Sequence, residues 1–304
     1  MVKTRVLHRT AALCLILACV GLLCASAGTK PQPEPVPEPQ VFVLRTVHAA
    51  AEPTARFLTG GMAFAPEEAD GLTVLGTSPH LSEVYPRALL TAPYSVRRHG
   101  GSPCVLIVHT HTTEAYSPTD GYRSEDPAEN IVRVGEALAE ALTARGIGVI
   151  HNKTVHDQPS FAMAYSACLD DLTPILEENP SICAVLDIHR DAYAVDGVQQ
   201  AYLADGDTAQ LLLVCGDGGN YDYNGWQSNL NWAVKLYAAA NRREPELIRA
   251  LRLDHARYNQ HILPGALLIE VGAAGNTLPQ AISAAQRFGA VLAEVLQALP
   301  EEAA

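Results

Sequence analysis

The apolar run CVLIVH at residues 104–109 begins the regular part of this sequence. A short, continuous apolar run is typical of a strand that is buried on both faces. Residues 128–145 then show apolar side chains at helical spacing and end before Gly146, which favours a helix terminus there. A second brief apolar run at 148–151 predicts another strand. This order predicts two parallel strands joined by a crossover helix.

The same alternation continues to the end of the chain. Further strands are expected over 182–189, 210–216 and 266–271. Further helices are expected over 160–178, 226–251 (with a break near Pro245) and 277–299. The sequence therefore predicts an α/β fold with three layers, α/β/α, and a mostly parallel central sheet.

Composition excludes several classes of protein. The chain has 304 residues, of which 48% are hydrophobic, so a sizeable core can be buried and a wholly disordered chain is excluded. Acidic residues outnumber basic ones by 33 to 21, which gives a formal net charge of −12. Because nucleic-acid binding depends on Lys and Arg neutralising phosphates, we expect no nucleic-acid partner.

The N-terminal part predicts export. Basic residues precede an uncharged apolar run at 11–27, so residues 1–28 are expected to be a signal peptide or a membrane anchor, with lipoprotein attachment as a third alternative. Proline occupies alternate positions within residues 29–40, which predicts a stiff linker. Residues 41–99 are expected to be either a stalk or part of the catalytic fold. The catalytic domain, 100–304, would lie outside the cytoplasm.

Three of the expected strands end in side chains that can bind a metal ion. The first runs into His109 and His111, the third carries the stretch 187–191 with His189, and the last contains Glu270. Two histidines and a carboxylate with an open position for water are a catalytic zinc arrangement. His109 and His111 would share a face of an extended chain, so spacing does not choose between them. A buried Glu270 requires a cation or a proton.

Four motifs in this order resemble the stage II sporulation protein P family: HTHTTEAY (109–116), GIGVIHNKTVHD (146–157), DIHRDA (187–192) and RYNQHILPGALLIEVGAAGNTL (257–278). The resemblance implies a fold similar to that of the zinc N-acetylmuramoyl-L-alanine amidases. It implies cleavage of the amide between muramic acid and L-Ala of the peptidoglycan stem peptide, and also of peptide cross-links. It further implies action at the membrane of the sporulation septum during engulfment, beside stage II sporulation proteins D and M.

The resemblance also implies roles for individual residues. His111 and His189 correspond to the zinc ligands, and Glu270 to the catalytic glutamate. Glu114 is favoured as the third ligand, with Asp126 and Glu129 held open, because no glutamate near the start of the first long helix falls cleanly on the amidase pattern.

The expected chemistry is metal-assisted hydrolysis. Zinc lowers the pKa of bound water toward about 7, and Glu270 would act as the general base and acid. Arg190 is expected either to stabilise the oxyanion or to bind a substrate carboxylate, with a surface salt bridge as the alternative. Two other functions remain open. One is a zinc carboxypeptidase, because His111 and Glu114 have its His-x-x-Glu spacing. The other is a non-catalytic peptidoglycan-binding or scaffold domain, which would not need the buried Glu270.

Overall fold

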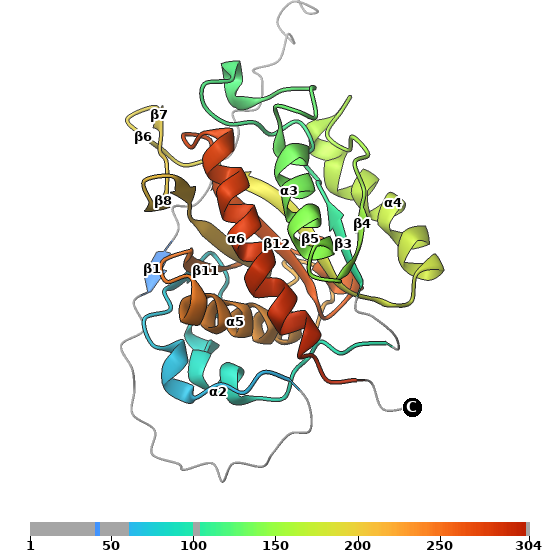
Figure 1. The fold of residues 1–304 in the computed structure, drawn as a ribbon, viewed down its shortest axis with the longest axis vertical. Helices are drawn as coiled ribbons and strands as arrows, with labels where there is room; N and C mark the ends of the chain where they lie inside the picture. Colours follow the sequence, from blue (N-terminus) through green and yellow to red (C-terminus); the bar gives the residue numbers. More distant parts are fainter. Residues whose placement is uncertain (1–39, 43–60, 100–103, 302–304) are drawn as a thin grey trace, which may run out of the picture. The chain divides into compact units, whose positions relative to one another are not determined.

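A computed structural model describes residues 40–42, 61–99 and 104–301 (Figure 1). Its centre is a sheet with the strand order β1-β2-β11-β10-β12-β5-β3-β4. In chain order, these strands are β1 (Gln40–Phe42), β2 (Val74–Gly76), β3 (Cys104–Val108), β4 (Gly148–His151), β5 (Ile182–Asp191), β10 (Leu211–Gly216), β11 (Ile248–Asp254) and β12 (Ala266–Ala273). Neighbours are parallel except at β1–β2 and β10–β12. The predicted α/β fold with a mostly parallel central sheet is confirmed.

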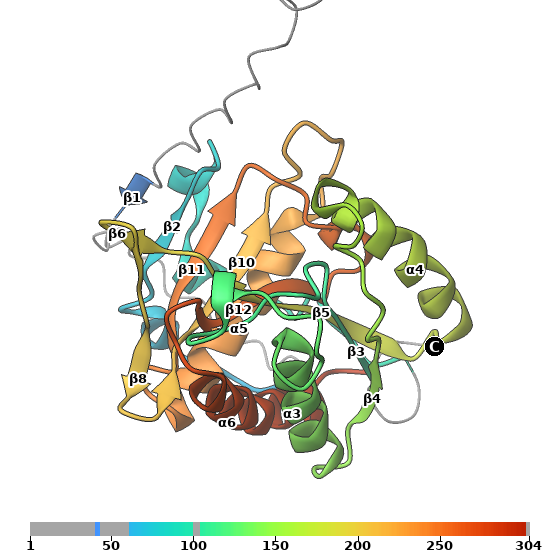
Figure 2. The ribbon, with the colours of Figure 1, turned by 90° about the horizontal axis from the view of Figure 1, so that it is seen from above.

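Helices cover the two faces of the sheet unequally. The helices α3 (Ile131–Thr143), α5 (Trp226–Arg243) and α6 (Leu278–Gln297) bury one face in the larger core. The helix α4 (Ala164–Glu178) packs on the other face and forms a smaller core with β3 and β5. Figure 2 shows α3 and α6 on one side of the sheet and α4 on the other. The face with α4 is therefore only partly covered by helix.

The two-residue period of a strand decides which side chains reach that partly covered face. In β3, Val105 and Ile107 enter the larger core, whereas Leu106 and Val108 pack toward α4. The same alternation in β5 places Val185 toward α4. His189, four residues further along, therefore points to the same side as Val185.

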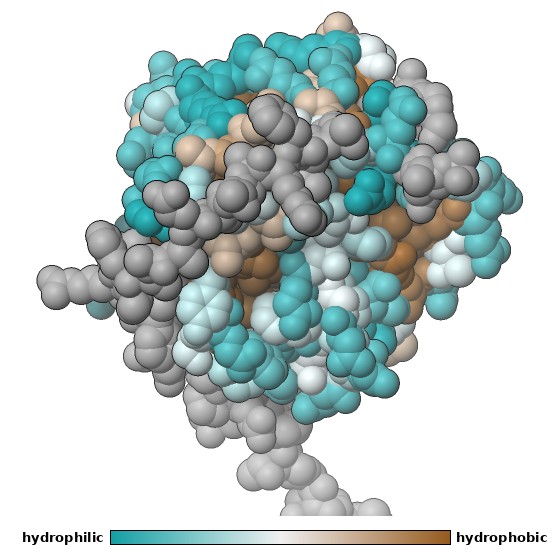
Figure 3. Space-filling model, turned by 90° about the horizontal axis from the view of Figure 1, so that it is seen from below, coloured by the Kyte–Doolittle hydropathy of each residue, from teal (hydrophilic) through white to brown (hydrophobic). Residues whose placement is uncertain are grey.

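The short remaining elements lie at the margins of the sheet. The helix α2 (Pro86–Thr91) precedes β3, and two hairpins follow β5: β6 (Ala194–Val195) with β7 (Val198–Gln199), and β8 (Leu203–Asp205) with β9 (Thr208–Ala209). Figure 3 views the molecule from the side opposite to Figure 2 and shows hydrophilic residues over much of that face, with apolar areas between them.

The helix expected over 226–251 is present up to Arg243, and the prediction was wrong for its last residues. The helix α5 ends at Arg243, and β11 begins at Ile248, after Pro245. Proline disfavours a helical conformation in the residue before it, and IRALRLD alternates as a strand does. The strand β11 pairs with β10 and β2 and widens the sheet.

Residues 61–99 belong to the same α/β unit as the rest of the described chain, so residue 100 is not a domain boundary. The strand β2 pairs with β11 in the central sheet, and one compact unit runs from Pro39 to Ala304. On α5, the buried Lys235 donates hydrogen bonds from Nζ to the carbonyl oxygens of Leu90 (2.6 Å) and Ala92 (2.8 Å). Of the two alternatives for residues 41–99, the described part is integral to the fold rather than a stalk.

The expected signal or anchor at 1–28 and the linker at 29–39 lie outside the described residues. Within the described part of the chain, no helix has the length and apolar character needed to cross a membrane.

Candidate active site

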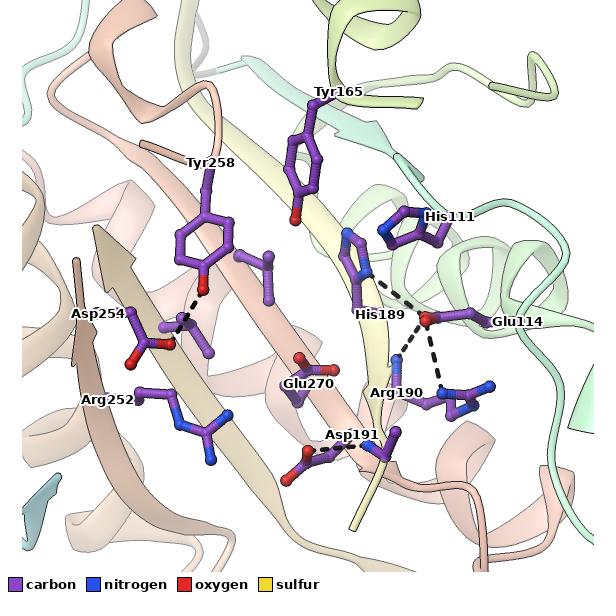
Figure 4. A pocket seen from close by; sticks show the side chains of 13 residues that line it. His111, Glu114, Tyr165, His189, Arg190, Asp191, Arg252, Asp254, Tyr258 and Glu270 are labelled. Atoms are coloured by element: carbon purple, nitrogen blue, oxygen red, sulfur yellow. Dashed lines mark hydrogen bonds and ion pairs between the residues drawn. The ribbon is translucent and has the colours of Figure 1, made fainter. Parts of the chain in front are cut away.

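Polar side chains gather on the open part of the sheet face that carries α4. They surround a cavity of about 210 Å³. Figure 4 shows side chains from several segments of the chain pointing into it. Its lining comprises His111, Glu114, Tyr165, His189, Arg190, Asp191, Ala192, Val214, Arg252, Asp254, Tyr258, Leu268 and Glu270. All the residues favoured from the sequence as ligands or catalytic groups therefore meet in one place.

The strands set the positions of two of these residues. His189 lies in β5 and Glu270 in β12, and the two residues are paired neighbours in the parallel ladder. They lie on the sheet face within the strands rather than beyond the strand ends, because β5 continues to Asp191 and β12 to Ala273. The site is thus formed on a rigid floor.

His111 and Glu114 reach the cavity from a turn that follows β3. The backbone turns directly after the strand, with Glu114 N bonded to His111 O at 3.1 Å and Thr112 Oγ1 bonded to His109 O at 2.9 Å. The rings of His111 and His189 are perpendicular, with centroids 5.4 Å apart. Phe161 stacks on His111 at 4.0 Å, which fixes the orientation of the imidazole.

His109 and His111 do not share a face, contrary to the expectation for an extended chain. His109 is fully buried against α3, where Nδ1 donates to Ile188 O at 3.0 Å. Since Nδ1 carries the proton, Nε2 must accept the hydrogen bond of 2.9 Å from His151 Nε2. His109 is therefore a structural residue, and His111 is the histidine that faces the cavity.

Glu114 is buried and held by Arg190. Its Oε2 accepts from the backbone N of Arg190 at 3.0 Å, and its Oε1 lies 3.5 Å from Arg190 Nη1. Arg190 also donates to the carbonyl oxygens of Ala115 and Tyr122, each at 3.1 Å. The guanidinium of Arg190 lines the cavity and also holds the loop that carries Glu114, so its expected contact with substrate or oxyanion stays a prediction.

The other two candidates for a third ligand do not reach the cavity. Asp126 and Glu129 are exposed and bond locally, Asp126 Oδ1 to Ala128 N at 2.8 Å and Glu129 Oε2 to Ser124 Oγ at 3.2 Å. Both belong to the turn before α3, whose first residues are capped by Asn130. Among these three carboxylates, Glu114 alone is placed beside His111 and His189.

Carboxylates surround His189 on both sides. Its Nδ1 lies 3.4 Å from Glu114 Oε2, and its Nε2 lies 2.9 Å from Asp187 Oδ1 without the geometry of a hydrogen bond. Burial alone lowers the pKa of His189, but the charge of Asp187 and the contact with Glu114 raise it well above the ordinary value. Asp187 is itself fixed by the backbone N and hydroxyl of Thr110.

In contrast to His189, His111 and Glu270 have pKa values that are shifted toward the neutral form. Burial, followed by the nearby charge of His189, lowers the pKa of His111 to about 4, so its imidazole is neutral at pH 7. Burial raises the pKa of Glu270 to about 8, and the neighbouring Glu114 and Asp191 raise it further while His189 lowers it. A carboxyl group with a pKa in this range can carry a proton near neutral pH.

Whether these residues suit a metal ion can be tested from their unused atoms. His111 Nδ1 and Glu270 Oε2 are buried and have no hydrogen-bond partner among the described residues, whereas His189 Nε2 lies 2.9 Å from Asp187 Oδ1. Such orphaned atoms are costly unless they bind something. As they stand, no three His, Cys, Asp or Glu side chains of the described chain are arranged to hold a metal ion. The two imidazoles and the carboxylate are side chains that suit zinc. To complete the ligand set, the Glu114 carboxylate must rotate away from Arg190.

Sequence reasoning missed three residues on the far side of the cavity. Arg252 and Asp254 lie in the second half of β11, beyond the helix expected to end at residue 251, and Tyr165 comes from α4. Asp254 Oδ2 accepts from the Tyr258 hydroxyl at 3.0 Å. The alternation over 251–254 (LRLD) was the signal that could have indicated a strand with Arg252 and Asp254 on one face.

The fold and the site define an α/β protein with a buried histidine–carboxylate centre on the open face of its sheet. The family model named Stage II sporulation protein P (SpoIIP) matches residues 68–297, which is most of the sequence. The chain therefore belongs to the stage II sporulation protein P family.

Similar proteins include a relative of known sequence and several solved structures. The Stage II sporulation protein P of Bacillus subtilis (strain 168) is 26% identical over 212 residues, which are 64% of this chain and 52% of that protein. This chain thus matches about half the length of that relative. An N-acetylmuramoyl-L-alanine amidase of Nostoc punctiforme is 16% identical with a TM-score of 0.40, and the match covers 65% of this chain and 97% of that one. The CwlD amidase of Clostridioides difficile is 12% identical with a TM-score of 0.43, covering 65% and 99%. At these TM-scores the structural likenesses say nothing about the activity of this chain.

Proposed function

We propose that this protein is a zinc-dependent peptidoglycan hydrolase that cleaves the amide between N-acetylmuramic acid and L-Ala of the stem peptide. The observation that carries the proposal is the meeting of His111, His189 and Glu270 at one cavity, in which His111 Nδ1 and Glu270 Oε2 are buried without a hydrogen-bond partner. Membership of the stage II sporulation protein P family supports a role in remodelling the cell wall during sporulation.

In this proposal, His111, Glu114 and His189 hold the metal ion. Bound zinc supplies a Lewis acid and lowers the pKa of a bound water. Asp187, itself fixed by Thr110, lies beside His189 Nε2 and orients that imidazole. Phe161 does the same for His111 by stacking. The raised pKa of His189 means that metal binding must displace a proton, so metal affinity should fall as the pH is lowered.

Glu270 is the proposed general base and acid. It takes a proton from the attacking water and delivers this proton to the nitrogen of the leaving L-Ala, so that the amide becomes a carboxylate and a free amine. Its pKa, raised by burial to about 8, suits both halves of this transfer near neutral pH. No side chain competes for its buried Oε2 within the described residues.

The decisive experiment uses the full chain on purified peptidoglycan, with mass spectrometry of the released products and metal analysis of the protein. We expect free peptides beginning at L-Ala, loss of release with a chelator and recovery with zinc. Release of single C-terminal residues would instead indicate a carboxypeptidase, which the His-x-x-Glu spacing of His111 and Glu114 also suits. Binding without any release under zinc would contradict the hydrolase and favour a scaffold domain. Cleavage of peptide cross-links by the same preparation would establish the second expected activity.

Matched variants separate the proposed roles. Glu270→Gln should retain zinc and lose turnover, whereas His189→Ala should lose zinc. Glu114→Ala should weaken zinc binding, and the exposed Asp126→Ala and Glu129→Ala serve as controls that should not. Zinc retention by Glu114→Ala would place the third ligand elsewhere.

We also propose the cellular setting implied by the family. The domain would act outside the cytoplasm at the septal membrane, anchored through residues 1–28, with stage II sporulation proteins D and M as partners. Fractionation of cells expressing the full chain, with and without residues 1–28, tests the anchor. Co-purification with each partner tests the interactions.

A further inference from the structure

Arg252 is a cation in the cavity without a partner. Its Nε is buried and has no hydrogen-bond acceptor, and no ion pair joins Arg252 to any side chain in the described part of the chain. Figure 4 shows its guanidinium standing at the side of the cavity opposite His111 and Glu114. An arginine that is left unpaired in an acidic protein is expected to meet an anion from outside.

The carboxylates near Arg252 are occupied elsewhere. Asp254 accepts hydrogen bonds from Tyr258 at Oδ2 (3.0 Å) and from Thr77 at Oδ1 (3.0 Å from N). Asp191 pairs with Arg249 at 2.5 Å. The arginine of the cavity that could hold a ligand is therefore Arg252, since Arg190 donates to the carbonyl oxygens of Ala115 and Tyr122.

The sheet register fixes where Arg252 lies relative to Glu270. Leu212 of β10 pairs with Glu270, and Val214, two residues further along β10, pairs with both Leu268 and Arg252. Arg252 is thus two strands and two residues away from Glu270, or about 12 Å between Cα atoms from ordinary strand spacing. The floor between them is apolar and consists of Val214 and Leu268.

This spacing places Arg252 near a substrate group that is distant from the bond that is cut. An extended peptide advances about 3.5 Å per residue, so a carboxylate on the residue after L-Ala lies about 7 Å from the reacting carbon. The long side chain of arginine covers the remaining distance. In the stem peptide, the second residue is joined through its side-chain carboxyl group, so its α-carboxylate is free.

We propose that Arg252 binds the free α-carboxylate of the second stem-peptide residue and selects peptides that carry it over peptides in which it is amidated. This inference rests on the proposed hydrolase function and adds a specificity residue to it. The alkyl part of the peptide lies over Val214 and Leu268, and the guanidinium donates two parallel hydrogen bonds to the carboxylate. Recognition of a neutral carboxamide would lose the charge and one acceptor.

The test compares two soluble muramyl tripeptides that differ only in whether this group is a carboxylate or a carboxamide. Zinc-loaded wild-type protein should cleave the carboxylate about 10- to 100-fold more efficiently, the range expected for a hydrogen-bonded charge. Arg252→Met should lose that preference, with a large rise of KM on the carboxylate and a smaller rise on the carboxamide, which keeps one acceptor for the guanidinium. Arg252→Lys, which keeps the charge but not the two parallel bonds, should fall between them.

The control is Arg287→Met on α6, where the arginine pairs with Asp205 outside the cavity; this variant should keep the wild-type preference. Equal wild-type cleavage of both substrates would overturn the role of Arg252 and leave the hydrolase standing. So would an equal loss on both substrates in Arg252→Met and Arg252→Lys, since that pattern indicates structural support. Absence of cleavage of either substrate by the wild-type protein would overturn the hydrolase and this inference together.

Discussion

Lys235 should make the stability of the protein depend on pH in the alkaline range. The side chain is only 2% exposed, and its ammonium group lies 4.5 Å from the ring centroid of Tyr94. Burial lowers the pKa of Lys235 from 10.5 to about 8. The folded protein therefore releases this proton at a lower pH than the unfolded chain.

The sign and size follow from this difference. Below pH 8 both states hold the proton and the penalty for burying the charge is fully present. Between pH 8 and 10.5 the unfolded chain binds more protons than the folded one, so the free energy of unfolding rises with pH. At 1.36 kcal/mol for each pKa unit, deprotonation of Lys235 relieves a burial penalty of about 3 kcal/mol. The two hydrogen bonds to backbone carbonyls stabilise the charged form, which reduces the expected gain to about 2 kcal/mol at the lower end.

Urea unfolding of the wild-type protein and Lys235→Met from pH 7 to 10.5 measures the effect. The difference between their unfolding free energies should move by about 2–3 kcal/mol in favour of the wild type as the pH rises. Other titrating groups cancel because both proteins carry them. Lys153→Met replaces a half-exposed lysine that pairs with Glu136 and should give a curve parallel to the wild type. Parallel curves for Lys235→Met as well would refute the reasoning.

Substitutions at four further positions test other parts of the structure. Gly135→Ala should destabilise the protein by about 1–2 kcal/mol despite the helix preference for alanine, because the new Cβ would lie 2.6 Å from the buried His109 ring; a higher melting temperature would contradict this. Asn130→Ala should cost about 1 kcal/mol through loss of the α3 cap, whereas Asn130→Asp keeps an acceptor for Val132 N and should cost less by thermal unfolding. Arg190→Lys should lower the unfolding free energy by about 2–4 kcal/mol, since two buried carbonyls lose a donor; full stability with a raised KM would restore the substrate-binding role. In chelator-treated protein, Glu270→Gln should raise the unfolding free energy by about 1–3 kcal/mol by removing a buried carboxylate without a partner, and a fall would mean that Glu270 has a stabilising contact.

The sequence predicted the strands that are buried on both faces, because a continuous apolar run admits few other interpretations. The run before His189 and the run around Glu270 each became a central strand, and their pairing brought both residues to one cavity. The strand β11 was missed because its first residues, 248–251, were interpreted as the end of a helix. Arg252, the next residue, was left without an element and so was not recognised as a site residue.

The contacts that join distant segments could not be predicted from local patterns. The turn after β3 separates His109 from His111, and its hydrogen bonds involve Thr112 and the segment around His156. The engagement of Arg190 depends on Tyr122, in a loop far along the chain. The motifs themselves do not indicate these contacts. In DIHRDA, Arg190 is simply the residue after His189, with no sign of the carbonyl groups that it binds.

The strand order explains why Glu270 and Arg252 can both stay unpaired. The strand β10 lies between β12 and β11 and puts Leu212 and Val214 on the floor between the two charges. If β11 were beside β12, the two side chains would meet at about 4 Å and attract by about 4 kcal/mol at an effective dielectric constant of 20. With β10 between them their Cα atoms lie about 12 Å apart, and the charge of Arg252 lowers the pKa of Glu270 by less than burial raises it. A paired Glu270 would have a lowered pKa and would be a poor proton acceptor. Insertion of an apolar strand thus keeps apart the two groups that we propose as proton acceptor and as anion-binding residue.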